Sequence, residues 1–201
     1  MKRVIAGCAV IALLAACTAL QPPQVEQAST YVLEAMPAAG AQRPRRDLVL
    51  EVSMPRARPG FDTPQMAYTR RANALDYFAR HRWADTPAHM LAPLLAQALE
   101  QSGSFRAVVQ SPSLATAQLR LDTELVRLQQ DFSARPSRVQ LTLRAQLIDA
   151  DTRRVLAAAE FDETEAAPSD DPYGGVIAAN RALARLLERL VAFCTEAGAA
   201  R

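Results

Sequence analysis

Lysine, cysteine, histidine and aromatic residues are all scarce in this chain of 201 residues. It contains three cysteines and two histidines, aromatic residues make up 5% of it, and its only lysine is Lys2. Beyond the N-terminal segment, only His81, His89 and Cys194 could supply imidazole or thiol chemistry. No HExxH, CxxC or GxSxG motif is present, and no strand precedes Gly174 and Gly175 to make a phosphate-binding loop. We therefore expect no catalytic residue, no metal site and no enzyme.

The chain also lacks an excess of charge. Its formal net charge is +2, and Lys2 and Arg3 account for it, because the other 21 basic residues equal the 21 acidic ones. A nucleic-acid partner requires a basic excess on one face of the protein. We therefore expect no nucleic-acid partner.

The apolar run at the N-terminus is too short to span a bilayer. It covers residues 4–14 and is followed by the polar residues 21–23, whereas a transmembrane helix needs about 20 apolar residues. A basic start, a short apolar stretch and the small residues Ala15 and Ala16 are typical of a cleaved export signal. We assign residues 1–16 to this signal.

The residues Leu14, Ala15, Ala16 and Cys17 resemble the lipobox of bacterial lipoproteins. The resemblance implies that Leu14, Ala15 and Ala16 are recognised as the signal and that Cys17 carries a diacylglyceryl thioether and an N-acyl chain. Two or more acyl chains give a stable membrane anchor. The alternative is that Cys17 only ends an ordinary secretory signal. No cofactor is expected beyond the covalent lipid.

The polar, proline-containing segment that follows is expected to be a tether. We assign residues 17–28 to the lipidated tether and residues 29–201 to one globular domain, a usual size for a single core. With Cys17 acylated, Cys194 has no partner for an intramolecular disulfide, and it is expected to be a buried apolar residue.

Alternation of apolar and polar residues predicts an antiparallel sheet with one solvated face. The alternation is clearest in residues 138–148, and in residues 118–128 it changes phase between Leu125 and Val126, which predicts a β-bulge. The expected strands are residues 31–33, 48–54, a hairpin within 65–83, 105–109, 118–128, 138–148 and 155–161.

Two amphipathic helices are predicted. The first covers residues 87–102, with Thr86 as its N-cap and Gly103 as its stop; Pro93 predicts a kink or a later start. The second covers residues 172–193, with Asp171 as its N-cap, after an acidic loop (residues 164–172) that is expected to be disordered. The expected fold is a two-layer α+β domain, with a mainly antiparallel sheet and both helices on one face.

Aromatic side chains gather in the hairpin before the first helix. Tyr68, Tyr77, Phe78 and Trp83 belong either to the core or, in part, to an exposed anchor for a partner protein. Tyr68, Tyr77 and Trp83 are the candidate docking residues. His81 and His89 are expected to be surface imidazoles near a helix start.

Residues 62–109 resemble the signature segment of the ABC-type transport auxiliary lipoproteins, the PqiC-like family. The matching features are a Tyr-Arg strand, a second aromatic strand, the Arg82-Trp83-Ala84 turn, a leucine-rich helix and the exit Ser102-Gly103-Ser104-Phe105. The resemblance implies a non-enzymatic lipoprotein that assists an ABC permease, its ATPase and an MCE-domain protein in moving lipids between the two membranes of a Gram-negative envelope.

The resemblance also implies a homo-oligomer on the outer membrane, facing the periplasm, and Thr18 after Cys17 agrees with that location. A different expectation is a periplasm-facing lipoprotein that itself binds a lipid or other apolar ligand between helices and sheet. A third, a periplasmic hydrolase, would depend on His81 or His89.

Overall fold

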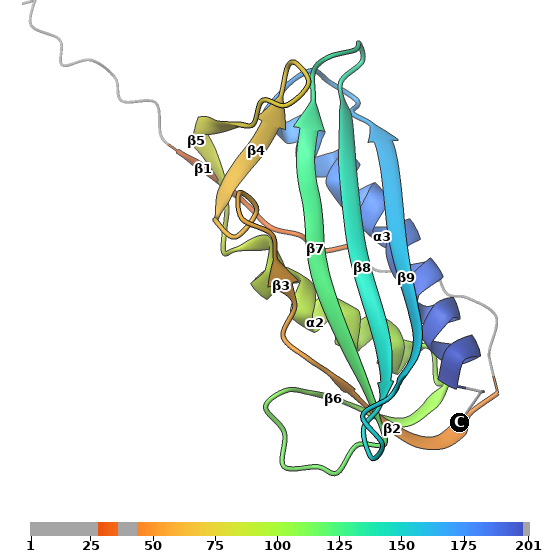
Figure 1. Ribbon diagram of the computed structural model, residues 1–201. Helices are drawn as coiled ribbons and strands as arrows, with labels where there is room; N and C mark the ends of the chain where they lie inside the picture. Colours follow the sequence, from red (N-terminus) through yellow and green to blue (C-terminus); the bar gives the residue numbers. More distant parts are fainter. Residues whose placement is uncertain (1–27, 36–43, 199–201) are drawn as a thin grey trace, which may run out of the picture.

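The computed structural model describes residues 28–35 and 44–198 and shows a nine-stranded sheet with two helices on one face (Figure 1). The strands are β1 (Ser29–Tyr31), β2 (Arg46–Val52), β3 (Arg56–Ala57), β4 (Gln65–Thr69), β5 (Asp76–Trp83), β6 (Phe105–Gln110), β7 (Leu119–Asp131), β8 (Arg138–Asp149) and β9 (Val155–Ala166). The helices are α2 (Pro87–Gln101) and α3 (Pro172–Ala197). The described helices leave the opposite face uncovered, which confirms the predicted two-layer α+β architecture.

Strand β7 is the centre of the sheet because strands pair with both of its edges. β8 pairs antiparallel with one edge, and β9 pairs antiparallel with β8. The other edge is occupied by three short strands in succession, β2, β3 and β4, each parallel to β7. Beyond them, β6 pairs with β2, and β5 joins β4 to β1. The long ladders are antiparallel, as predicted, and the parallel ladders are short.

The core lies between the helices and the sheet. In β8, Leu141, Leu143 and Leu147 are buried while Arg144 and Gln146 are exposed, which confirms the predicted alternation. The helices contribute leucines that are almost completely buried, namely Leu91, Leu95, Leu99, Leu183, Leu186, Leu187 and Leu190. Full burial of a leucine side chain stabilises the fold by about 1.5–3 kcal/mol. This apolar contact holds the two layers together.

The predicted β-bulge is present in β7. Leu125 and Arg127 pair with consecutive residues of β8, so Val126 is an extra residue in the ladder. Side chains of a strand alternate between the two faces of the sheet, and one extra residue shifts the side chains that follow it by one position. As a result, Leu125 and Leu128 are both buried on the helix-covered face.

Helix α3 begins at the predicted cap, and its first turn packs closely against the sheet. Oδ1 of Asp171 accepts a 2.7 Å hydrogen bond from the backbone N–H of Gly174. A Cβ atom on Gly174 would lie 2.2 Å from the carbonyl oxygen of Ser169, and one on Gly175 would lie 2.3 Å from Oε1 of Gln130. The two glycines therefore permit close packing. The helix continues to Ala197, beyond its predicted end at residue 193.

Helix α2 has Thr86 at its N-cap position and Pro87 as its first residue, as predicted, but its cap lacks the expected side-chain bond. The Thr86 side chain makes no capping hydrogen bond, and Asp85 accepts a bond from the Thr86 backbone N–H instead. The helix begins at Pro87, so a start near Pro93 is wrong. Pro93 is exposed, and water can bond to the carbonyl oxygen that proline leaves without a donor. Gly103, with φ of +64°, follows the helix as predicted.

Ion pairs attach α3 to the edge strand β9. Glu163 accepts hydrogen bonds from Arg185 (3.1 Å) and Arg189 (2.7 Å), and Glu165 accepts one of 2.8 Å from Arg185. The predicted strand end at residue 161 is therefore wrong, because β9 continues to Ala166. Arg185 lies 20 residues beyond Glu165, so the acidic segment is neutralised only when α3 packs against the sheet.

The acidic loop after β9 is ordered, contrary to the prediction. Oδ1 of Asp170 accepts a 2.7 Å hydrogen bond from the backbone N–H of Ser137, and the N–H of Ala167 donates to the Ser137 carbonyl oxygen at 2.8 Å. These bonds join the loop to the segment between β7 and β8. Long-range partners therefore order a segment whose composition is typical of disorder.

Two short strands were not predicted correctly. β1 covers Ser29–Tyr31 instead of residues 31–33, because Leu33 leaves the sheet and is buried in the core. β3 lies in a segment expected to be a loop, between Pro55 and Pro59. Both strands pair in parallel with a strand far away in the sequence, and neither carries an alternating pattern of its own.

Candidate interaction surfaces

Six ring side chains form a continuous row on the side of the sheet that faces α3. Neighbouring ring centroids in the row lie 4.5–6.1 Å apart. In order, the residues are Phe132, Tyr68, Phe78, His81, Tyr31 and Tyr173, and we call them the aromatic row. Five of the six are half-buried, and Tyr173 is 59% exposed. Such a partly exposed set of rings is a candidate contact surface.

The β4–β5 hairpin separates the predicted aromatic residues. Tyr68 and Phe78 face α3, with ring centroids 4.5 Å apart. Tyr77 lies on the opposite face of the sheet, and its hydroxyl donates a 2.9 Å hydrogen bond to the carbonyl oxygen of Gly60. Trp83 is 4% exposed and belongs to the core, so we correct it from a docking candidate to a packing residue. Docking by Tyr68 and Tyr77 stays a prediction.

The sequence pattern does not place Tyr31, Phe132 and Tyr173 in this row. Tyr31 reaches it because β1 pairs in parallel with β5, and the Tyr31 hydroxyl lies 3.2 Å from Nδ1 of His81. Phe132 follows β7, which pairs in parallel with β4, and Tyr173 is in the first turn of α3. The only feature of the sequence that could have indicated these three members of the row is an aromatic residue at or next to the end of β1, β7 and α3.

An open groove of about 770 Å³ lies on the uncovered face of the sheet. Its floor belongs to β7 and β8, and the segments before β4 and between β4 and β5 form its rim. Representative lining residues are Arg58, Phe61, Arg71, Leu75, Arg127 and Arg144.

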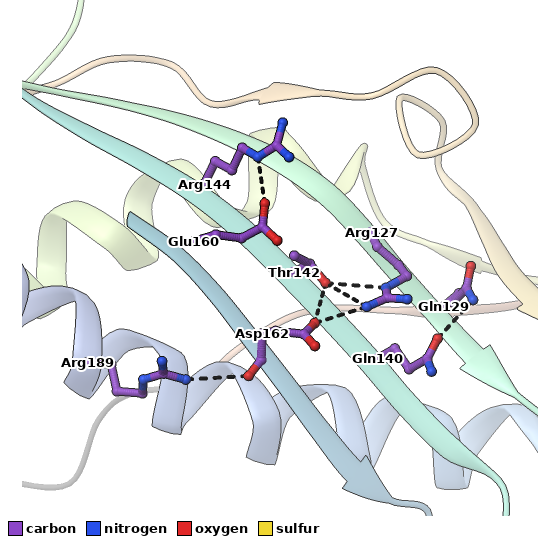
Figure 2. A network of polar contacts seen from close by, with 8 residues as sticks. All are labelled: Arg127, Gln129, Gln140, Thr142, Arg144, Glu160, Asp162 and Arg189. Carbon is purple, nitrogen blue, oxygen red and sulfur yellow. Dashed lines mark hydrogen bonds and ion pairs between the residues drawn. The ribbon is translucent and has the colours of Figure 1, made fainter. Parts of the chain in front are cut away.

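Polar side chains of the groove floor and of β9 bond to one another (Figure 2). Thr142 Oγ1 donates a 2.5 Å hydrogen bond to Oδ1 of Asp162, and Arg127 donates one of 3.0 Å to the same oxygen. The hydrogen bond from Thr142, followed by that from Arg127, holds the pKa of Asp162 below its usual value, against the opposing effect of desolvation. Arg144 donates a 2.6 Å bond to Glu160. Because these charges are already paired, we interpret the floor as structural.

The titratable residues of interest lie in three separate places. His81 is in the aromatic row, whereas His89 pairs with Asp85 at 3.3 Å on the exposed start of α2. Cys194 is fully buried in the core, and desolvation raises the pKa of its thiol. Within the described residues, no group of three His, Cys, Asp or Glu side chains could hold a metal ion. The structure does not bring His81, His89 and Cys194 together.

A small cavity lies between the sheet and the start of α3. Met66, Trp83, Leu128 and Gln130 are among its lining residues, and its volume is about 10 Å³. This volume holds about one water molecule. The cavity is too small for an acyl chain and gives no support to the alternative function, binding of a lipid or other apolar ligand between helices and sheet.

The lipobox residues Leu14, Ala15, Ala16 and Cys17 lie outside the described residues, so lipidation stays a prediction. The boundary at residue 16 also lies outside them, and the boundary between tether and domain at residue 28 stays a prediction. In the described part of the chain, neither helix is both long and apolar enough to cross a membrane.

The family assignment rests on most of the described domain. A family model for the ABC-type transport auxiliary lipoprotein component matches residues 31–191, a range that includes the aromatic hairpin and most of α3. The chain belongs to this family. The predicted resemblance is confirmed, and the protein is an auxiliary lipoprotein component of an ABC-type transport system. A lipoprotein family agrees with a location in the cell envelope.

Solved structures share the fold at low sequence identity. The crystal structure of protein XCC0632 from Xanthomonas campestris is 22% identical with a TM-score of 0.78, covering 85% of this chain and 96% of that one. An uncharacterized protein is 15% identical with a TM-score of 0.68, covering 83% and 97%. The hypothetical protein CT253 from Chlamydia trachomatis is 10% identical with a TM-score of 0.56, covering 78% and 100%. No curated protein matches the chain.

Proposed function

We propose that the protein is an outer-membrane lipoprotein that acts without enzymatic activity in an MCE/ABC-type lipid transport system linking the inner and outer membranes. The family match over residues 31–191 carries this proposal, since it assigns the chain to ABC-type transport. The dispersed positions of His81, His89 and Cys194 agree with a role other than catalysis.

The proposed anchor is a diacylglyceryl thioether and an N-acyl chain on Cys17, after cleavage directed by Leu14, Ala15 and Ala16. Each buried methylene contributes about 0.8 kcal/mol, so several chains hold the protein on the membrane. The domain then faces the periplasm. The test is incorporation of labelled palmitate, which Cys17→Ser should abolish while moving the protein to the soluble fraction. Unchanged labelling and fractionation in that variant would contradict the anchor.

The proposed partners are an MCE-domain protein, the ABC permease and its ATPase, with the auxiliary protein as a homo-oligomer. Tyr68 and Tyr77 are the docking candidates that the structure leaves partly exposed, on opposite faces of the sheet. Their positions separate two modes of docking. A partner on the open face would depend on Tyr77, and one at the aromatic row would depend on Tyr68.

The experiment is capture of the MCE-domain protein by the lipidated chain. We expect Tyr68→Ala or Tyr77→Ala to lower the captured amount several-fold, a usual effect of removing an aromatic anchor. The control is Leu114→Ser, a fully exposed position in the β6–β7 loop. Absence of capture by the unchanged protein, together with an unchanged lipid balance of the envelope when the protein is deleted, would overturn the proposed function.

A further inference from the structure

We propose that the end of the domain carrying Tyr31 and Tyr173 rests against the membrane leaflet that holds the anchor. This inference rests on the acyl anchor proposed above and adds a contact between the folded domain and the lipid surface. The surface is the Tyr31–Tyr173 end of the aromatic row, where ring centroids lie 6.1 Å apart.

The position of the first strand carries the argument. The tether proposed between Cys17 and Ser29 has eleven residues (18–28), a length of chain that reaches at most about 36–40 Å. β7 alone has 13 residues, or roughly 43 Å of strand. β1 and the β6–β7 loop lie at opposite ends of the sheet (Figure 1). The tether therefore keeps the Tyr31–Tyr173 end nearest to the leaflet.

The chemistry of this end suits a lipid headgroup region. Tyrosine combines an apolar ring with a polar hydroxyl, and it is enriched at membrane–water interfaces. Tyr173 is the most exposed ring of the row, at 59%. Arg135 is exposed in the loop whose Ser137 bonds to Asp170, so a cation is available to lipid phosphates at this end.

The two acidic residues directly before the start of α3 are engaged in the fold. Asp170 accepts a hydrogen bond from the Ser137 N–H, and Asp171 accepts one from the Gly174 N–H. Their carboxylates are directed to backbone donors. The anchor also raises the effective concentration of the Tyr31–Tyr173 end at the bilayer. Even a weak contact is then formed for a substantial part of the time.

The buried thiol allows a direct test with a single fluorescent label. Cys194 is fully buried, and Cys17 is blocked by its thioether, so an introduced cysteine is the reactive thiol. One label site is Ala134→Cys, exposed in the β7–β8 loop next to the row, and the matched site is Leu114→Cys at the far end. The acylated protein is placed in vesicles of phosphatidylethanolamine and phosphatidylglycerol that carry a headgroup spin label.

We expect the spin label to quench the fluorophore at residue 134 at least about two-fold more than at residue 114, because interfacial residues lie at headgroup depth. Adding Tyr173→Ser should remove about half or more of that excess, as expected for loss of an interfacial ring. Equal quenching at both sites overturns the proposal. An excess that Tyr173→Ser leaves unchanged also overturns it, because the tether alone would then set the distance.

The experiment distinguishes a wrong proposal for the acyl anchor from a wrong proposal for the membrane contact. The intact mass of each sample shows whether Cys17 is acylated. If it is not, the proposed anchor fails, and the contact is tested by sedimentation of the unacylated chain with the same vesicles. Binding that falls several-fold with Tyr173→Ser but not with Leu114→Ser would keep the contact, and absence of binding would overturn it. Equal quenching combined with Tyr68-dependent capture of the MCE-domain protein would assign the row to that partner.

Discussion

At the scale of single residues, the start of α3 depends on one carboxylate. The hydrogen bond from the Gly174 N–H, followed by that from the Ser169 side chain, holds the pKa of Asp171 below the usual value of 3.8. Because the folded-state pKa is the lower one, the stabilisation is present above about pH 4 and is lost as the pH falls through the folded value. Acid therefore weakens this cap.

We predict that Asp171→Ala lowers the free energy of unfolding at pH 7 by about 0.5–2 kcal/mol, since the cap bond is lost. Asp171→Asn keeps an acceptor, so it should retain most of the stability at pH 7 and lose less of it between pH 5 and pH 2. Urea unfolding at these pH values measures both effects. Equal acid dependence in the unchanged and Asn proteins would show that Asp171 is not the titrating cap.

A second prediction concerns Gly174, whose missing side chain makes room for backbone. Gly174→Ala should destabilise the protein by about 1–3 kcal/mol through overpacking, although alanine favours a helix by about 1 kcal/mol. The reason is the distance of 2.2 Å from the added Cβ to the carbonyl oxygen of Ser169. In the control, Gly198→Ala, the nearest atom is 3.4 Å away, so no destabilisation is expected. A stabilising Gly174→Ala would refute this packing.

At the scale of elements, the bulge in β7 predicts which deletion the sheet tolerates. Deleting Val126 should leave a folded protein, because Leu125 and Leu128 then alternate regularly with Arg127 between them. Deleting Arg144 from β8 should prevent folding, since Leu147 would turn to the solvated face. Circular dichroism and thermal unfolding distinguish the two. Equal loss of structure in both deletions would contradict the proposed role of Val126 as an insertion.

The elements also show what the sequence could and could not predict. β7, β8 and α3 were predictable because their patterns repeat over ten or more residues, and even the phase change at Val126 is visible. β1, β3 and the end of β9 depend on partners far away in the chain, such as Arg185 for Glu165. The aromatic row has the same origin, so the sequence indicated its hairpin members and not the complete row.

At the scale of the whole molecule, the single described cysteine reports on global unfolding. Cys194 is fully buried, and burial raises the pKa of its thiol, so both access and thiolate formation are suppressed in the folded protein. In the processed, acylated chain, we predict labelling by a thiol reagent only as fast as the protein unfolds. Rapid labelling without denaturant would contradict this prediction and show local opening of α3. Added reductant should not change the free energy of unfolding.

The arrangement around β7 also has a consequence for the order of folding. β2, β3 and β4 precede β7 in the chain, yet each finds its place along the same edge of that one strand. A ribosome delivers the N-terminal part first, and domains generally fold as units. The first 118 residues can therefore form only two separate groups of paired strands, β2 with β6 and β4 with β5 and β1, until β7 has been synthesised. A nascent chain of that length should remain protease-sensitive and dependent on chaperones.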